Sequence, residues 1–565
     1  MRALFRHKQS VAKVFESDSE NYFRHLVYSI IVALVYTGIY NLPYYSIIYS
    51  STPYAAYAVK SGVLIAFFYI LPLIYILSFN RIIYLSVFCF VILSSTILLY
   101  YTYKIGVVHN IYLFSLVYET NIHEIKSVVS HNLVLLAATS VLLAVIIGRM
   151  SPKAHILYKK SLVTIIIMSV LIPLASGLLR DWRGFKIRDD ALSGVHPMPY
   201  GYLQAFVRAT RQHIRLSSYV GERAAYDGPA EAKPNGRPLY VVLALGESVR
   251  ADHLPVYGYA RETMPRLSRE ELHIFPPAFS MATGTTQSVL GILTQATVAA
   301  QDLSYSGPTL LSVFKKAGFR TIWLTNQGSM GKGETYVRAV SKSADYYDVS
   351  GNLYKSSTKL VDADVLPMLD KALAGPEQDT LIVLHTYGSH FNYDDRYYEE
   401  YRIFTPVCGK DFLACPLDRL INSYDNSLIA TDGYLADLIH RLRDKNAVLF
   451  MTSDHGTSMK EGNHRGHIPG TPGMAQPALR MVPFMLWFSP AFEYRERISF
   501  LESNLDKRVS HDMLFHSTLA AAGISVSILE EELNIFSPSL RAHQDRYISE
   551  ETAQVFAERN GSGRP

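Results

Sequence analysis

The hydrophobic residues of this 565-residue chain are unevenly distributed, and the first third is far more apolar than the rest. Five segments there approach or exceed the length at which a helix spans a bilayer, namely residues 25–44, 59–79, 82–101, 132–148 and 161–179. The second segment contains Pro72, which transmembrane helices tolerate. The first is long and lacks a small-x-small cleavage site, so we expect a retained anchor. The pattern predicts a transmembrane domain over residues 1–180.

Lysine and arginine residues predict the orientation of these segments. They gather before the first segment, in the short turn between the second and third, and between the fourth and fifth. The positive-inside rule assigns all three regions to the cytoplasm. Five spans then deliver everything after residue 179 to the other side, which in a bacterium is the periplasm. We therefore expect a multi-pass protein of the bacterial inner membrane, in contact with membrane lipids. The net charge of +5 is modest and several of the basic residues flank apolar segments, which favours membrane orientation over nucleic-acid binding.

Cysteine is rare in the chain. Cys408 and Cys415 are close together in a polar segment, a spacing that suits a small disulfide outside the cytoplasm. Cys89 falls within an apolar segment and is expected to be a buried thiol. Two cysteines without neighbouring histidines make a poor zinc finger. The disulfide and the topology are independent inferences, and both point to the periplasm.

The pattern changes after residue 180. Residues 181–236 form a connector, in which residues 199–215 predict an amphipathic helix on the membrane surface and residues 227–238 a Pro/Gly-rich linker. From residue 237 to 565, short apolar runs alternate with helical patterns. The expected strands are residues 239–245, 321–325, 380–385, 447–452 and 483–488, and two expected helices are residues 310–317 and 420–443. This alternation predicts an α/β domain with a mainly parallel sheet covered on both faces.

Polar side chains follow two of the expected strands. Asp454 and His455 come directly after one apolar run, and Glu247 follows the first. Open α/β sheets bind their ligands at the carboxyl ends of such strands. Carboxylate oxygen and imidazole nitrogen together suit Zn²⁺, with Mn²⁺ as the second choice. The plainer alternative is a polar turn in which Asp454 caps a helix.

Hydroxyl and imidazole groups recur at the same edge. Thr285 lies in a Ser/Thr/Gly turn that runs into a helical pattern. A helix N-terminus is a natural phosphate site, although simple N-capping by Thr285 accounts for the same pattern. His390 follows another strand, and His464 and His467 follow the Asp-His pair. The recurrence of these groups at successive strand ends favours a metal-dependent enzyme.

Four stretches carry a family resemblance. They are GESVRADHLPVYGYARETMPRL from Gly246, ATGTTQSV from Ala282, SDHG from Ser453, and LIVLHTYGSHFNYDDRYYEEY before FTPVC and INSYDNSLIATD. The chain resembles the membrane-bound phosphoethanolamine transferases of the alkaline-phosphatase/sulfatase superfamily, and the last stretch is most similar to the branch that modifies the Kdo sugar of lipopolysaccharide. The resemblance implies transfer of phosphoethanolamine from phosphatidylethanolamine to lipid A or the Kdo/inner core, through zinc and a covalent threonine intermediate.

The resemblance also implies roles for single residues. Thr285 matches the nucleophile, and the zinc-site positions are Glu247, Thr285, Asp454 and His455. The positions matched to substrate binding are His390, His467, Asn326, Lys332 and Glu124, the last in a lipid-proximal loop. Thr283 and Thr286 are rivals for Thr285, and Ser288-Val289 sets the register that favours Thr285. His464 is a rival for His467.

Three alternatives remain at this level. A superfamily relative could transfer another phospholipid head group, as a glycerophosphate polymerase does, but the cysteine pair and the GESVRADH and FTPVC stretches do not fit it. A phosphodiesterase or sulfatase-type hydrolase is the second alternative; a sulfatase needs a modifiable Cys or Ser in its own motif, which the chain lacks. The third is a membrane protein whose external domain only binds glycans, and such a domain has no need of zinc.

Overall fold

The structure is a computed structural model. It describes residues 23–41, 80–105, 129–151, 198–219, 225–233, 236–300, 307–327, 336–351, 359–409, 414–459 and 476–545, with a few short stretches between and after them. The chain divides into two compact units. One comprises Met1–Phe114 and Val129–Ala209, and the other comprises Ser115–Val128 and Thr210–Pro565.

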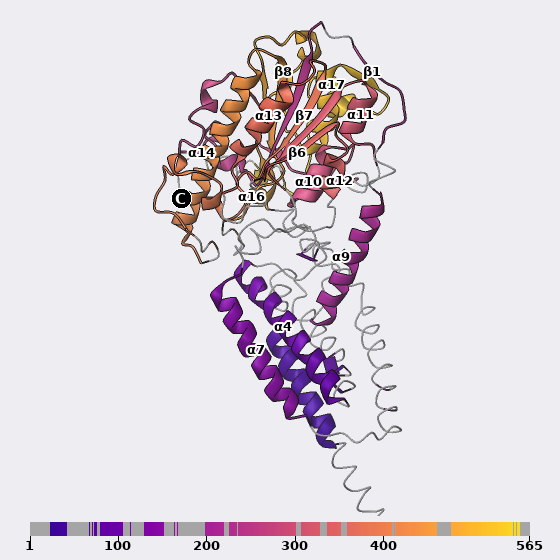
Figure 1. Cartoon of the computed structure of the whole chain (residues 1–565), viewed down its shortest axis with the longest axis vertical. Helices are drawn as coiled ribbons and strands as arrows, with labels where there is room; N and C mark the ends of the chain where they lie inside the picture. Colours follow the sequence, from indigo (N-terminus) through magenta and orange to yellow (C-terminus); the bar gives the residue numbers. More distant parts are fainter. Residues whose placement is uncertain are drawn as a thin grey trace, which may run out of the picture. The chain divides into compact units, whose positions relative to one another are not determined.

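The first unit is helical. Three of its described helices are long and apolar enough to cross a membrane: Phe23–Tyr40, Arg81–Lys104 within α4 (Arg81–Ile105), and α7 (His131–Arg149). They correspond to the first, third and fourth predicted segments. The other two, residues 59–79 and 161–179, lie mostly outside the described residues, so the count of five spans stays a prediction. Helices α4 and α7 pack side by side (Figure 1).

Side chains cap these helices and join them. Asn80 Oδ1 accepts hydrogen bonds from the N–H groups of Ile82 and Ile83 at the start of α4. Within the bundle, Tyr36 Oη and Ser95 Oγ are 2.5 Å apart. Lipid offers no partner to a polar group, so hydroxyls in a membrane bundle pair with one another.

Helix α9 (Tyr200–Tyr219) follows these helices in the chain. It confirms the helix expected over residues 199–215, whose location on the membrane surface stays a prediction. Asn41 exchanges two hydrogen bonds with the backbone of Met198 just before it.

The second unit is built on a seven-stranded sheet of order β3-β10-β8-β2-β7-β5-β6. Its strands are β2 (Leu239–Gly246), β3 (His273–Ile274), β5 (Arg320–Thr325), β6 (Tyr346–Val349), β7 (Thr380–His385), β8 (Asn446–Ser453) and β10 (Phe484–Phe488). The five strands from β8 to β6 run parallel, and β10 and β3 are antiparallel to their neighbours. This confirms the mainly parallel sheet, and every predicted strand is found with its bounds correct to one residue.

Shorter elements complete the unit. The helices are α10 (Thr285–Ile292), α11 (Leu310–Lys316), α12 (Tyr336–Ser341), α13 (Leu366–Leu373), α14 (Leu417–Leu442), α16 (Pro477–Arg480) and α17 (Leu514–Ala522). Two further antiparallel pairs join β1 (Ala230–Ala232) to β11 (Ile524–Val526) and β4 (Ala278–Phe279) to β9 (Met481–Val482).

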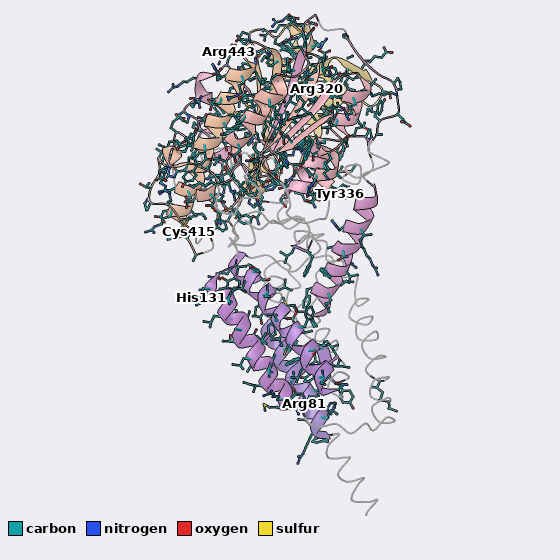
Figure 2. The ribbon with its side chains drawn as sticks, viewed as in Figure 1. Arg81, His131, Arg320, Tyr336, Cys415 and Arg443 are labelled. Carbon is teal, nitrogen blue, oxygen red and sulfur yellow. A yellow bond between two sulfur atoms is a disulfide. The ribbon has the colours of Figure 1, made fainter. Side chains whose placement is uncertain are left out.

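Helices cover both faces of the sheet, which explains why its central strands β2, β7 and β8 are buried and largely apolar. On one face, Leu243 and Leu245 of β2 belong to a core that includes Val289 of α10, Phe314 of α11 and Leu519 of α17. On the other face, α14 lies against β2 and β8, where Leu428 and Met451 line a common cavity. Arg443, labelled in Figure 2, directly follows α14. It pairs with Glu270 at 2.7 Å.

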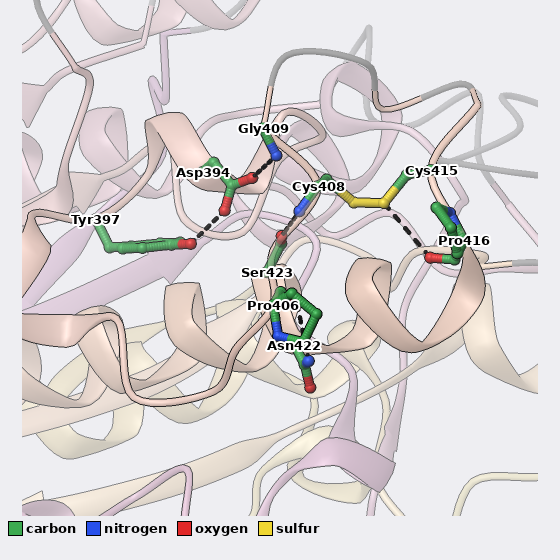
Figure 3. Close-up of a disulfide and its surroundings, with 9 residues drawn as sticks. All are labelled: Asp394, Tyr397, Pro406, Cys408, Gly409, Cys415, Pro416, Asn422 and Ser423. Carbon is green, nitrogen blue, oxygen red and sulfur yellow. Dashed lines mark hydrogen bonds between the residues drawn. A yellow bond between two sulfur atoms is a disulfide. The ribbon is translucent and has the colours of Figure 1, made fainter.

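A disulfide joins Cys408 to Cys415, with the Cα atoms 5.5 Å apart, as the sequence led us to expect (Figure 3). Two backbone hydrogen bonds hold the loop beside it: the N–H of Cys408 donates to Ser423 Oγ of α14, and that of Gly409 donates to Asp394. Cys89 is a free thiol. We expected it to be buried, but it is only half-buried.

The sheet brings distant residues to one edge. Gly246 pairs with Ser453 across β2 and β8, and Leu245 pairs with His385 across β2 and β7. The residues that follow these strands therefore meet at the carboxyl edge of the sheet, where α/β proteins place their ligands.

Candidate active site

Three side chains converge at the carboxyl edge of the sheet. Ligand atoms of Glu247, Asp454 and His455 all lie within 4.8 Å of one another, and all three residues are buried. Glu247 follows β2, and the other two follow β8. The juxtaposition expected from the strand ends is thus present in the structure.

Hydrogen bonds decide which atoms of this cluster face its centre. His455 Nδ1–H donates to the carbonyl oxygen of Gly456 at 2.7 Å, so the neutral form of the ring carries its lone pair on Nε2. That nitrogen lies 3.2 Å from Glu247 Oε1 and 3.3 Å from Asp454 Oδ2. A backbone-oriented imidazole whose other nitrogen faces carboxylates is the usual arrangement of a metal ligand.

The two oxygens of Asp454 are not equivalent. Oδ1 accepts hydrogen bonds from the N–H groups of Ser248, at 3.1 Å, and of His455, at 2.7 Å. Oδ2 is buried and has no hydrogen-bond donor among the described residues. A buried carboxylate oxygen in this condition is costly unless a cation binds it. Two carboxylate oxygens and one imidazole nitrogen form a ligand set that fits Zn²⁺.

The pKa shifts have the same physical origin. Burial and the neighbouring Glu247 carboxylate raise the pKa of Asp454. Burial by itself would lower the pKa of His455, but the carboxylates of Asp454 and Glu247 outweigh it and raise the pKa. Both pKa shifts have the same cause: the cluster holds two buried carboxylates and too little positive charge to balance them.

Thr285 lies directly against this cluster. It is the first residue of α10, after Gly284 at the N-cap. Its hydroxyl donates to Glu247 Oε2 at 2.8 Å and lies 3.3 Å from His455 Nε2. The first turn of α10 leaves backbone N–H groups without partners inside the helix, and such a helix N-terminus favours an anion. The geometry therefore favours Thr285 over Thr283 and Thr286 as the reactive hydroxyl.

Two unusual backbone conformations hold Glu247 in place. Ser248 has a φ of 61°, rare for a residue with a side chain, and its hydroxyl donates to Glu247 Oε1 at 2.8 Å. Gly388 has a φ of 48°, and a Cβ atom there would lie 2.5 Å from the backbone N and O of Glu247. The chain after β7 thus passes so close to Glu247 that only glycine fits.

A further residue of the site was missed by the sequence analysis. Gln327 Nε2 donates to Glu247 Oε2 at 3.1 Å and to the carbonyl oxygen of Thr386. The neighbouring Asn326, predicted as a substrate contact, is fully buried, and its amide bonds to the backbone of Val361 and Tyr387. The Asn326 side chain therefore holds the neighbouring backbone in place. Gln327 is the amide whose side chain faces the metal-ligand cluster.

The other predicted substrate residues are only partly described. His390 is buried in the loop after β7, and Arg396 holds this loop by donating to the carbonyl oxygens of His390 and Phe391, both at 3.3 Å. Arg396 also stacks on the Tyr387 ring at 4.2 Å. Lys332, Glu124, His467 and its rival His464 lie outside the described residues. The roles of all these residues stay predictions.

Comparison with known proteins agrees with this architecture. The Sulfatase family model matches residues 240–524, about half of the chain. The Kdo(2)-lipid A phosphoethanolamine 7''-transferase of Salmonella typhimurium is 32% identical over 266 residues, which cover 46% of this chain and 46% of that protein. The chain thus matches about half the length of this curated relative.

Two solved structures share the fold. Lipooligosaccharide phosphoethanolamine transferase A (EptA) of Neisseria meningitidis, an integral membrane protein, has a TM-score of 0.78 at 21% identity, over 90% of this chain and 98% of that one. The C-terminal periplasmic domain of EptC from Escherichia coli, solved in complex with Zn, has a TM-score of 0.51 at 25% identity, over 57% and 92%. By its family match, this chain belongs to the Sulfatase family of the alkaline phosphatase/sulfatase superfamily, and its relatives there include phosphoethanolamine transferases.

Proposed function

We propose that this protein is a zinc-dependent phosphoethanolamine transferase that moves phosphoethanolamine from phosphatidylethanolamine to lipopolysaccharide. The observation that carries the proposal is the position of the Thr285 hydroxyl, 2.8 Å from Glu247 and 3.3 Å from His455 beside a buried carboxylate pair. The names of the relatives point to the same group transfer.

The residues that would hold the zinc are Glu247, Asp454, His455 and the Thr285 oxygen. When bound, zinc lowers the pKa of a coordinated hydroxyl and balances negative charge at the reacting phosphate. The chain itself supplies the orientation: Ser248, Gln327 and the Gly388 turn fix Glu247, and the Gly456 carbonyl fixes the His455 ring.

The proposed reaction has two balanced steps. The Thr285 hydroxyl gives up its proton, for which Glu247 Oε2 is the nearest acceptor, and its oxygen attacks the phosphorus. The bond to the diacylglycerol oxygen breaks, diacylglycerol leaves with a proton, and phosphoethanolamine stays on Thr285. An acceptor oxygen of lipopolysaccharide then displaces Thr285, whose oxygen regains a proton.

Other residues would bind the phosphate and the two lipids. The N–H groups that begin α10 and the imidazoles of His390 and His467 would stabilise charge on the transferring group. Lys332 is proposed for a further substrate contact and Glu124 for the lipid-proximal loop, whereas Asn326, whose amide bonds to the backbone of Val361 and Tyr387, is proposed to support the site from behind the substrate. The name of the Salmonella relative favours a Kdo sugar as the acceptor over a lipid A phosphate.

We further propose a transmembrane domain over residues 1–180 with five spans, a connector over residues 181–236 and a periplasmic catalytic domain over residues 237–565. Alkaline-phosphatase fusions made after Gly236 should then be active and fusions at Lys153 inactive. The reverse pattern would contradict the periplasmic location.

The proposed function is tested by mass spectrometry of lipopolysaccharide from cells that produce the wild-type protein, the Thr285→Ala variant or no protein. We expect phosphoethanolamine on the lipopolysaccharide only with the wild type, and fragmentation of the product locates the acceptor. Release of free phosphoethanolamine without modified lipopolysaccharide would indicate a hydrolase. A glycerophosphate product formed from phosphatidylglycerol would indicate the polymerase-like alternative.

A further inference from the structure

A buried histidine outside the metal cluster touches both halves of the candidate site. His511, just before α17, is fully buried. Its Nδ1 lies 3.2 Å from the backbone nitrogen of Met281, and its Nε2 lies 3.0 Å from the carbonyl oxygen of Ser453. Met281 belongs to the turn that leads into Thr285, and Ser453 directly precedes Asp454.

The two contacts fix the tautomer of this ring. The backbone N–H of Met281 can only donate, so Nδ1 must be the unprotonated acceptor. The carbonyl oxygen of Ser453 can only accept, so Nε2 must carry the hydrogen. His511 is therefore a neutral bridge with one defined orientation, and each half of the site supplies one end of it.

The two residues before Met281 in this turn, Phe279 and Ser280, are also fixed by hydrogen bonds. Arg480 is fully buried, and its Nε and Nη2 donate to the carbonyl oxygen of Ser280 at 3.0 and 2.8 Å. The N–H of Ser280 returns a hydrogen bond to the carbonyl oxygen of Arg480 at 2.8 Å. One step earlier, the N–H of Phe279 donates to Val509, two residues before His511. The turn is thus fixed at three consecutive residues before it reaches Thr285.

The geometry points to His511 as a positioning residue that sets the distance between the Thr285 turn and the Asp454–His455 pair. This inference rests on the proposed function only in taking Thr285 as the nucleophile. A hydroxyl displaced by about 1 Å from its reactive position can lose about 100-fold in rate. Of the described contacts of His511, the two bridging hydrogen bonds are the ones that join the two halves of the site.

The chain offers a matched control. His516, in α17, is also fully buried, and its Nδ1 accepts the N–H of Glu530 at 3.0 Å. Glu530 lies in a segment after β11 that contributes none of the residues of the candidate site. Substitution of His516 therefore removes a buried imidazole of the same size without touching the bridge.

The test uses the full-length protein with His511→Asn, His511→Gln and His516→Asn. Asparagine places a polar atom near the Nδ1 position and glutamine near the Nε2 position, so each His511 variant keeps one end of the bridge. We expect both to lower kcat about 100-fold with KM for phosphatidylethanolamine within about threefold, and the control to stay within about twofold of the wild type. Hydrogen exchange of the peptide over residues 280–286 should accelerate most in His511→Gln, which loses the bond to Met281, and should not accelerate in the control.

A loss of kcat in the His511 variants no larger than in the control, or an unchanged exchange rate of the turn, would overturn the inference. If His511→Asn does not fold, His511→Gln decides by the same two measurements. If the wild-type protein transfers no phosphoethanolamine, the proposed function fails, and the exchange comparison alone decides the role of His511.

Discussion

The two units of the chain bury polar groups in different ways. In the helical unit, the described residues bury neutral polar groups, such as the Tyr36–Ser95 hydroxyl pair and the Asn41 amide that bonds to the backbone of Met198. In the sheet unit the buried partners include full charges, such as Arg480 with Asp545. A neutral hydroxyl pair costs little to bury, whereas a charge must be balanced. Buried charge in the sheet unit therefore has to be explained by structure or by function.

Two aspartates of the sheet unit separate these explanations. The Asp545 carboxylate is buried, pairs with Arg480 and accepts the N–H groups of Tyr547 and Ile548. Its pKa is lowered, because the hydrogen bond from His543, the pairing with Arg480 and the N–H of Tyr547 together outweigh its burial. Asp454 is equally buried, but its pKa is raised, and its Oδ2 lacks a donor among the described residues. A balanced charge serves the fold, whereas an unbalanced one indicates a site for a cation.

The largest effect on stability is expected from Asp545→Asn. This change leaves the Arg480 guanidinium buried without its counter-charge, so we expect a loss of about 3–5 kcal/mol in the free energy of unfolding. Denaturant unfolding of the purified protein in detergent measures it. A loss below about 1 kcal/mol would show that this pair is not the balanced structural charge described here.

The second prediction concerns a buried group that stays neutral. Burial lowers the pKa of His516 to about 4, against about 6.5 in an unfolded chain. Because the unfolded chain takes up the proton first, stability is lost as pH falls from about 6.5 towards 4, by about 2 kcal/mol at pH 5. His516→Asn should remove this part of the pH dependence. Parallel stability curves for the variant and the wild type between pH 7 and 5 would contradict it.

The third prediction reverses the sign seen at Asp545. In metal-free protein, Asp454→Asn relieves the repulsion between two buried carboxylates, so we expect the free energy of unfolding to rise by about 1–3 kcal/mol. In the presence of zinc the same variant should be less stable than the wild type and lose more than about 100-fold in activity. Thermal unfolding of the variant and the wild type, with and without zinc, measures both changes in stability. Destabilisation of the metal-free protein would show that Asp454 is a balanced structural charge.

The smallest effect is expected in the helical unit. Tyr36→Phe removes one neutral hydroxyl pair, and such pairs between membrane helices contribute about 0.6 kcal/mol on average. Unfolding of the Tyr36→Phe variant in detergent should show this small loss, with unchanged activity. A loss as large as that of Asp545→Asn would erase the contrast between the two units.

The sequence predicts the features that depend on local pattern. The strands that end at Glu247 and at Asp454 are continuous apolar runs, so their bounds and their shared edge could be read directly. The start of α10 at Thr285 follows from a Gly/Thr turn before a helical pattern. The side chain that faces the cluster after β5 could not be predicted in this way, because the chain bends at Asn326 directly after the strand and the alternation of side chains ends there. The sequence analysis chose Asn326 because it followed the family position.

The remaining features depend on contacts between residues distant in the chain. Arg480 meets Asp545 across 65 positions, and His511 meets Met281 across 230. Nothing near Arg480 or His511 in the sequence distinguishes them from surface residues. Their roles follow only from the folded arrangement of β4, β8 and the segment before α17.

The central claim is that Thr285 carries the transferred group, and trapping the intermediate tests it most directly. Wild-type protein is incubated with zinc and phosphatidylethanolamine without acceptor, digested, and its peptides are analysed by mass spectrometry. Thr285→Ala is the negative variant, and Thr286→Ala and Thr283→Ala are the matched controls within the same turn. We predict a phosphoethanolamine adduct on Thr285 in the wild type and both controls, and none in Thr285→Ala. An adduct on Thr286 or Thr283, or lipopolysaccharide modification by Thr285→Ala, would contradict the assignment.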